Sequence, residues 1–160
     1  MDMVVILMGS PSDQPFVEKI GAALDRLGVA WEVRVASAHK TPRYLLDLLD
    51  AYEANGKPKV YITVAGRSNA LSGMVDAHVV APVIACPPYS DRFAGADLLS
   101  SLRMPSGVAP AVVLEPEGAA LLAAKILAVS DAALRERVHA YQNAQAERVL
   151  QADRADRDRE

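Results

Sequence analysis

The sequence predicts an α/β fold in which a parallel sheet is covered by helices on both faces. Short runs rich in Val and Ile recur along the chain, and segments with helical spacing of apolar residues fill the intervals between them. Several of these runs are apolar at successive positions rather than alternating, which is typical of parallel strands buried on both sides. These observations predict a three-layer α/β/α domain with a doubly wound, flavodoxin-like sheet.

Five apolar runs are the predicted strands, and most are followed within a few residues by a signal for the start of a helix. The strands are expected at residues 3–8, 31–36, 60–65, 82–86 and 111–114. The start signals are capping residues or a proline in the first turn. They are Ser12 and Asp13 before Pro15, Thr41 before Pro42, Ser68 and Asn69 before Ala70, and Ser90 or Asp91 before Phe93.

Two extra helices are predicted at the C-terminal end, at residues 116–129 and from 130 to about 150. Leu134, Val138 and Tyr141 give the second helix an apolar stripe, although the predicted sheet is already complete. We therefore expect this helix to pack on another subunit. Residues 1–150 are expected to form a single domain, and residues 151–160, which alternate acids and arginines, a frayed tail.

The composition excludes several classes of function. The chain has 160 residues, of which 51% are hydrophobic, and this is enough for one domain with a sizeable core. Its 17 Lys and Arg residues are outnumbered by 20 Asp and Glu residues, so no basic surplus favours nucleic-acid binding. The apolar runs are too short to span a bilayer, and no signal peptide is visible. Cys86 is the one cysteine and is expected to be structural, so a cytoplasmic location is expected.

Three polar loops follow predicted strands, at the edge of the sheet where ligands of such folds bind. They span residues 9–13, 37–42 and 66–69. Their small hydroxyl side chains, Lys40 and the free N–H groups of the following helices would suit a phosphate, and Asp13 could bind ribose hydroxyls. Neither G-x-G-x-x-G nor G-x-x-x-x-G-K-[ST] is present, so the usual motifs for a dinucleotide or a triphosphate are missing.

His39 is the candidate general acid or base, because it lies in one of these loops at the carboxyl end of a strand. Structural alternatives stay open for its neighbours. Ser12 and Asp13 could serve as helix caps, and Lys40 could be an ordinary solvated side chain.

The other two histidines are not expected in the site. His78 follows apolar residues along one helix and is expected at the edge of the core or at an interface, while His139 is expected at the surface. No spacing of His, Cys or carboxylate residues is typical of a metal site, so metal chemistry is not expected.

Taken in order, the loops resemble those of the phosphoribosylaminoimidazole carboxylases of purine biosynthesis. The matching segments are residues 8–13 (MGSPSD), 37–42 (SAHKTP), 65–74 (AGRSNALSGM) and 101–107 (SLRMPSG). The likeness covers nearly the whole chain up to about residue 150, in the order and spacing of that family. It implies an enzyme that carboxylates the imidazole ring of a ribonucleotide without ATP, biotin, metal or another cofactor.

Two branches of that family differ in these loops. The mutase branch, which acts on N5-carboxyaminoimidazole ribonucleotide, typically has G-G-A-A-H-L-P-G-M in the third loop and S-A-H-R in the second. Here Ala70 stands where the mutase has its histidine, and Lys40 stands in place of the arginine. The chain therefore resembles class II, which combines aminoimidazole ribonucleotide with free carbon dioxide, and the mutase reaction is the alternative.

The resemblance also implies a role for individual residues. His39 is implied as the catalytic residue that moves a proton at C4 of the imidazole ring. The implied substrate-binding residues are Ser10, Asp13, Ser37, Lys40, Gly66 and Ser68, together with Ser12, Arg67 and Asn69. The expected partners are aminoimidazole ribonucleotide, carbon dioxide and further copies of the chain, as an octamer or tetramer, with no nucleic acid and no membrane.

A flavodoxin-like binding module is an alternative from a different class. A phospho-receiver needs an acidic cluster at the strand ends, and here Asp13 alone is well placed. A flavin is normally sandwiched by aromatic rings, which make up 5% of this chain. A colourless purified protein would exclude the flavin.

Overall fold

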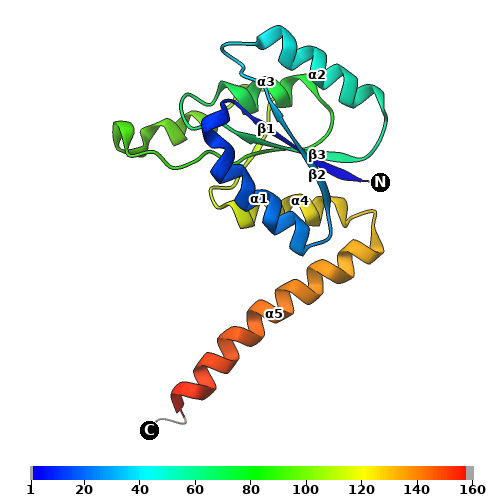
Figure 1. The fold of residues 1–160 in the computed structure, drawn as a ribbon, viewed down its shortest axis with the longest axis vertical. Coiled ribbons are helices and arrows are strands. Elements are labelled where there is room, and N and C mark those ends of the chain that lie inside the picture. The colour runs from blue at the N-terminus through cyan, green and yellow to red at the C-terminus, as the bar shows by residue number, and fades with distance from the viewer. Residues whose placement is uncertain (1, 158–160) are drawn as a thin grey trace.

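The computed structural model describes residues 2–157, which form a five-stranded parallel sheet between layers of helices (Figure 1). The strands are β1 (Met3–Met8), β2 (Ala30–Val35), β3 (Lys59–Val64), β4 (Val83–Ala85) and β5 (Ala111–Val112). Their order in the sheet is β2-β1-β3-β4-β5. This confirms the predicted α/β, flavodoxin-like fold, and each strand lies at its predicted place with ends that differ by at most two residues.

Helices cover both faces of the sheet (Figure 1). On one face lie α1 (Gln14–Arg26) and α4 (Pro116–Leu127), and on the other α2 (Pro42–Ala54) and α3 (Ala70–His78). The chain leaves β1 toward β2 and then returns to β3 on the other side of β1. The carboxyl ends of β1 and β3 therefore flank the switch point at which ligands bind in such sheets.

Strand β1 shows how the core is divided by the sheet. Val4, Ile6 and Met8 belong to the cluster under α1 and α4, whereas Val5 and Leu7 belong to the cluster under α2 and α3. Each of the five is at most 4% exposed, and burial of each such side chain contributes about 1.5–3 kcal/mol. Because both faces of the strand are buried, its sequence is apolar at every position.

The packing of α1 on β2 depends on a glycine. A Cβ atom at Gly21 would lie 2.4 Å from the ring of Trp31, so only a residue without a side chain fits there. The indole N–H of Trp31 donates a hydrogen bond to Asp25 Oδ1 at 2.7 Å. The ring of Trp31, the second residue of β2, is thus held against one face of α1.

The C-terminal helix differs from its prediction. Helix α5 (Ala132–Arg157) continues well beyond residue 150, where the sequence predicted a frayed tail, and Figure 1 shows it projecting away from the sheet. An ion pair between Arg157 and Asp153 at 3.1 Å, one turn apart, supports the last described turns. Residues 158–160 of the predicted tail lie outside the described residues. Within residues 2–157, no helix has the length and apolar character needed to cross a membrane.

The segment after β4 also differs from a regular helix. Residues Arg92–Ser101 form 3₁₀ turns, here called the η2 segment, and its start is irregular because Phe93 and Ala94 have positive φ angles of 52° and 51°. This conformation is unfavourable for residues with a side chain. Gly95 follows with φ 76°, and a Cβ there would lie 3.0 Å from the ring of Tyr89.

Candidate active site

A cavity of about 450 Å³ lies at the carboxyl ends of β1, β2 and β3, and we call it the loop pocket. Its volume is in the usual range for small-molecule sites. It is lined by residues of all three polar loops: Gly9, Ser10, Ser12, Asp13, Ser37, Ala38, His39, Lys40, Ala65, Gly66, Arg67, Ser68 and Leu71. The structure therefore brings together every site residue that the sequence predicted except Asn69.

The first loop turns sharply into α1. The N–H group of Gly9 donates to the carbonyl oxygen of Val64 at 2.9 Å, which holds the start of this loop against the end of β3. Ser10 has an extended backbone and caps the short 3₁₀ helix η1 (Pro11–Asp13), because its Oγ accepts a hydrogen bond from the N–H group of Ser12. The hydroxyl oxygens of Ser10 and Ser12 lie 2.8 Å apart, so the two side chains form one polar pair beside the pocket.

Asp13 stands at the N-cap position of α1, but its carboxylate makes no capping hydrogen bond to that helix. Partial burial raises the pKa of Asp13, and a hydrogen bond with the backbone of Ser10 opposes this rise. A Cβ atom at Gly66 would lie 3.7 Å from Asp13 Oδ1, so the third loop passes close to this carboxylate. Asp13 therefore does not cap α1 through its side chain, and it lines the loop pocket.

The second loop is a tight turn held by Ser37 and Thr41. The N–H group of Ser37 donates to Thr41 Oγ1 at 2.9 Å, and the hydroxyl of Thr41 donates back to the carbonyl oxygen of Ser37 at 3.2 Å. Ser37 Oγ accepts from the N–H group of Lys40 at 3.2 Å, so its own hydroxyl hydrogen can still be donated to a ligand.

This turn presents His39 and Lys40 at the pocket. Both residues are exposed, and neither side chain has a hydrogen-bond or ion-pair partner within residues 2–157. Their functional groups can therefore contact a ligand without breaking a contact of the folded chain. Lys40 and Arg67 are the cations of the lining and Asp13 is its one acid, which favours an anionic ligand.

The third loop connects β3 to α3. Gly66, Arg67 and Ser68 line the loop pocket, and the last two are exposed. Asn69, which was also predicted to bind substrate, is 5% exposed and does not line the pocket. Its Oδ1 atom instead caps α3 by accepting a hydrogen bond from the N–H group of Ser72 at 3.3 Å.

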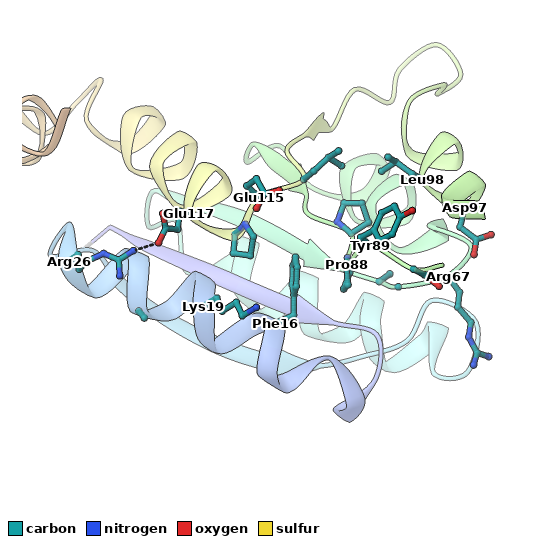
Figure 2. A pocket seen from close by; sticks show the side chains of 18 residues that line it. Phe16, Lys19, Arg26, Arg67, Pro88, Tyr89, Asp97, Leu98, Glu115 and Glu117 are labelled. Atoms are coloured by element: carbon teal, nitrogen blue, oxygen red, sulfur yellow. Dashed lines mark hydrogen bonds and ion pairs between the residues drawn. The ribbon is translucent and has the colours of Figure 1, made fainter. Parts of the chain in front are cut away.

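A second cavity of about 600 Å³ lies between α1, the start of α4 and the η2 segment, and we call it the helix pocket (Figure 2). Phe16, Pro88 and Tyr89 are among its walls, and Arg26 forms an ion pair with Glu117 at its rim at 2.8 Å. It shares Ala65, Gly66 and Arg67 with the loop pocket. Sequence reasoning did not predict this cavity, because its walls come from segments that carry no common motif.

The other histidines and the cysteine lie outside the loop pocket. His78 Nε2 is 2.7 Å from Asp50 Oδ1, so this histidine joins α3 to α2. Cys86 is buried, and its burial together with the nearby charge of Glu115 raises the pKa of the thiol to about 12. The thiol is therefore protonated at neutral pH, as expected of a structural cysteine. Within the described chain, no three His, Cys, Asp or Glu side chains gather as a metal site would require.

Comparison with known proteins assigns the family. The family model described as AIR carboxylase matches residues 3–148. The chain belongs to the AIR carboxylase family. A phosphoribosylaminoimidazole carboxylase of Treponema denticola is 52% identical over 151 residues, covering 94% of this chain and 95% of that protein. One of Archaeoglobus fulgidus is also 52% identical, covering 93% of this chain and 82% of that protein.

Solved structures of AIR carboxylases agree with this assignment. The crystal structure of Treponema denticola PurE superposes on this chain with a TM-score of 0.95 and 50% sequence identity, covering 97% of this chain and 98% of that one. The human bifunctional phosphoribosylaminoimidazole carboxylase/phosphoribosylaminoimidazole succinocarboxamide synthetase is 45% identical over 128 residues. That match covers 80% of this chain but 30% of the human protein, so it concerns one part of a longer enzyme.

Proposed function

We propose that this chain carboxylates 5-aminoimidazole ribonucleotide with free carbon dioxide, with His39 as the residue that moves the proton. The observation that carries the proposal is the loop pocket, which is lined by His39 and Lys40, whose side chains have no hydrogen-bond or ion-pair partner among the described residues. Relatives that are 52% identical over nearly the whole chain are named phosphoribosylaminoimidazole carboxylases, which supports this substrate class.

In this proposal, the three loops bind different parts of the nucleotide. The ribose phosphate is bound by Lys40 and the hydroxyls of Ser10 and Ser37, because charge-assisted hydrogen bonds are the strong ones for an anion. Asp13 accepts hydrogen bonds from the ribose hydroxyls. The backbone of the third loop at Gly66 and Ser68 lies along the imidazole ring.

Apart from its two substrates, the proposed reaction needs one group that carries a proton. The electron-rich carbon C4 of the aminoimidazole ring attacks carbon dioxide, and the electron pair of one C=O bond moves to oxygen to give the carboxylate. C4 then carries both hydrogen and carboxylate, and the ring regains its aromaticity when His39 removes that hydrogen as a proton. In the reverse direction His39 returns the proton to C4 and carbon dioxide leaves.

Two positions favour carbon dioxide over the N5-carboxy compound as the source of the carboxylate. Ala70, at the start of α3, has no group that could exchange a proton with the substrate, and Lys40 stands where the mutases have arginine. A paired assay decides between the reactions. Purified protein receives aminoimidazole ribonucleotide with bicarbonate, or N5-carboxyaminoimidazole ribonucleotide, each without ATP, and the ultraviolet change is followed. Efficient turnover of the second compound alone would overturn the proposal in favour of the mutase.

We also propose that the chain works as a homo-oligomer, an octamer or a tetramer. Helix α5 projects from the sheet (Figure 1), and Leu134 and Val138 are its buried residues among those described. Val149 and Leu150 near its end are 70% and 50% exposed, and a neighbouring copy would cover them. Light scattering on the purified protein tests the assembly, and a monomer at the concentration of the activity assay would contradict it.

A further inference from the structure

Asn69 is the buried residue of the third loop. It is 5% exposed, while Arg67, Ser68 and Ala70 on either side of it are exposed. A buried amide requires hydrogen-bond partners, because leaving it unpaired is costly. Its partners therefore show what the third loop is attached to.

Asn69 makes three hydrogen bonds, and two of them connect the third loop to a segment about thirty residues away in the sequence. Its side-chain Nδ2 donates to Ser101 Oγ, and its backbone N–H group donates to Ser100 Oγ at 3.0 Å. Its Oδ1 accepts from the N–H group of Ser72 in the first turn of α3. The hydroxyl of Ser100 donates in turn to the carbonyl oxygen of Asp97 at 2.7 Å. The end of the third loop is thus attached both to α3 and to the η2 segment.

The η2 segment lies outside the loop pocket but borders the helix pocket through Gly95, Asp97 and Leu98. Its start contains the unfavourable positive φ angles of Phe93 and Ala94. A segment with such backbone geometry holds its place when contacts elsewhere fix it. The hydrogen bonds at Ser100 and Ser101 are such contacts, and they end on the residue directly after Ser68 of the loop pocket.

We propose that Asn69 is a positioning residue that joins the third loop to the η2 segment and thereby sets the shape of the loop pocket without touching the ligand. The effect on catalysis rests on the proposed function, whereas the junction itself does not. A misplacement of about 1 Å in a binding loop can lower a rate by about 10²-fold, so a residue outside the pocket can matter for turnover.

The test uses variants that separate the junction from the helix cap. Ser101→Ala removes the partner of the Asn69 amide and leaves the cap at Ser72 intact. Asn69→Ala removes both. Asn69→Asp keeps an oxygen for the N–H group of Ser72 and can accept a hydrogen bond from the Ser101 hydroxyl, at a helix N-terminus that favours negative charge. Asp76→Asn is the matched control, because Asp76 also lies on α3, accepts a hydrogen bond from the N–H group of Ala109 outside that helix, and belongs to neither junction nor pocket.

The first measurement needs no ligand. Amide hydrogen exchange is followed by mass spectrometry on the intact purified protein, for peptides that contain residues 66–70 and the η2 segment. We expect exchange in both segments to become at least about tenfold faster in Ser101→Ala and Asn69→Ala, and to stay near the wild-type rate in Asn69→Asp and Asp76→Asn. Unchanged exchange at residues 66–70 in Ser101→Ala would overturn the proposal. If Asn69→Ala does not fold, Ser101→Ala and Asn69→Asp still decide.

The second measurement uses aminoimidazole ribonucleotide. Because coupling is reciprocal, the nucleotide should slow exchange in the η2 segment of the wild type and have little effect there in Ser101→Ala. We expect KM for the nucleotide to rise about tenfold in Ser101→Ala, with recovery in Asn69→Asp. A purely structural role would lower the melting temperature without this change in KM, and that result would overturn the positioning role. If the wild type neither binds nor carboxylates the nucleotide, the proposed function is wrong. Hydrogen exchange measured without ligand would still decide whether the junction exists.

Discussion

The helix pocket has a volume of about 600 Å³ and the loop pocket about 450 Å³, and they share residues 65–67, yet their walls offer different chemistry. In the helix pocket, Phe16, Pro88 and Tyr89 present apolar surface, and Arg26 is paired with Glu117. In the loop pocket, the side chains of His39 and Lys40 have no hydrogen-bond or ion-pair partner among the described residues. The comparison teaches that the loops at the carboxyl ends of β1, β2 and β3, more than volume, decide where a histidine and a lysine are brought together in one pocket.

The largest expected effect is a loss of turnover when His39 is replaced, and among the described residues no histidine lines the helix pocket. Asn has no group that takes up a proton near neutral pH, so His39→Asn should lower turnover by about 10²–10⁴-fold. Because the His39 side chain makes no hydrogen bond or ion pair with residues 2–157, we expect an unchanged melting temperature and nearly unchanged nucleotide affinity. Turnover is measured by ultraviolet absorbance and affinity by calorimetry. A variant with near-normal turnover would show that another group moves the proton.

The next largest effect is on nucleotide affinity, and it is tested by replacing one lysine from each pocket. Lys40→Met removes a cation from the proposed phosphate site and should weaken nucleotide binding by about tenfold to a hundredfold, since hydrogen bonds to charged groups contribute about 1.5–3 kcal/mol. Lys19→Met is the matched change in the helix pocket, where the side chain is also exposed, and should leave affinity unchanged. Calorimetric titration of both variants measures the difference. Equal losses would mean that the nucleotide also uses the helix pocket.

A smaller effect is expected for Asp13→Asn, which should weaken nucleotide binding but raise the stability of the fold at neutral pH. Asp13→Asn loses an acceptor for ribose hydroxyls, and we expect about tenfold weaker nucleotide binding. Burial raises the pKa of Asp13, so its charged form is less favourable in the folded state than in the unfolded state. The wild type therefore loses stability as pH rises from 3.8, the ordinary value, through the raised pKa, and the loss persists at neutral pH.

The raised pKa of Asp13 also predicts how the difference in melting temperature between Asp13→Asn and the wild type depends on pH. Asp13→Asn lacks this charge, so its melting temperature should exceed that of the wild type at neutral pH and the excess should vanish below pH 3.8. Melting curves of both proteins across this range measure it. A variant that is less stable than the wild type at neutral pH would show that the carboxylate is favourably bonded in the fold.

The smallest effect is expected at the rim of the helix pocket. The side chains of Arg26 and Glu117 are 50% and 65% exposed, and surface ion pairs of this kind contribute at most about 1 kcal/mol. Arg26→Gln should therefore change the free energy of unfolding by less than about 1 kcal/mol, measured by urea denaturation, and leave turnover unchanged. A clear loss of turnover would give the helix pocket a part in the reaction.

The sheet and the loop pocket could be predicted because local signals were enough. Continuous apolar runs identified the strands, and the carboxyl-end rule then placed residues 9–13, 37–42 and 66–69 side by side. The end of α5 was predicted too early because charge was taken as a sign of fraying, although Asp153 and Arg157 have the spacing of a helical ion pair.

Other features depend on contacts that a sequence does not display. The partners of Asn69 at Ser100 and Ser101 lie about thirty residues away, so its buried position had no local signal. The left-handed backbone of Phe93 and Ala94 contradicts the intrinsic preference of both residues, so their sequence does not predict it. The helix pocket is formed by segments from both halves of the chain, so its existence follows from the fold as a whole.

The contact between Gly21 and Trp31 has a practical consequence for every measurement proposed above. Trp31 is the one tryptophan of the chain, and it lies near the start of β2, whereas the pocket residues follow the ends of the strands. Its fluorescence should report the loss of packing between α1 and β2 and stay silent when a nucleotide is added. Tryptophan fluorescence can therefore separate an unfolded variant from one that is folded but inactive.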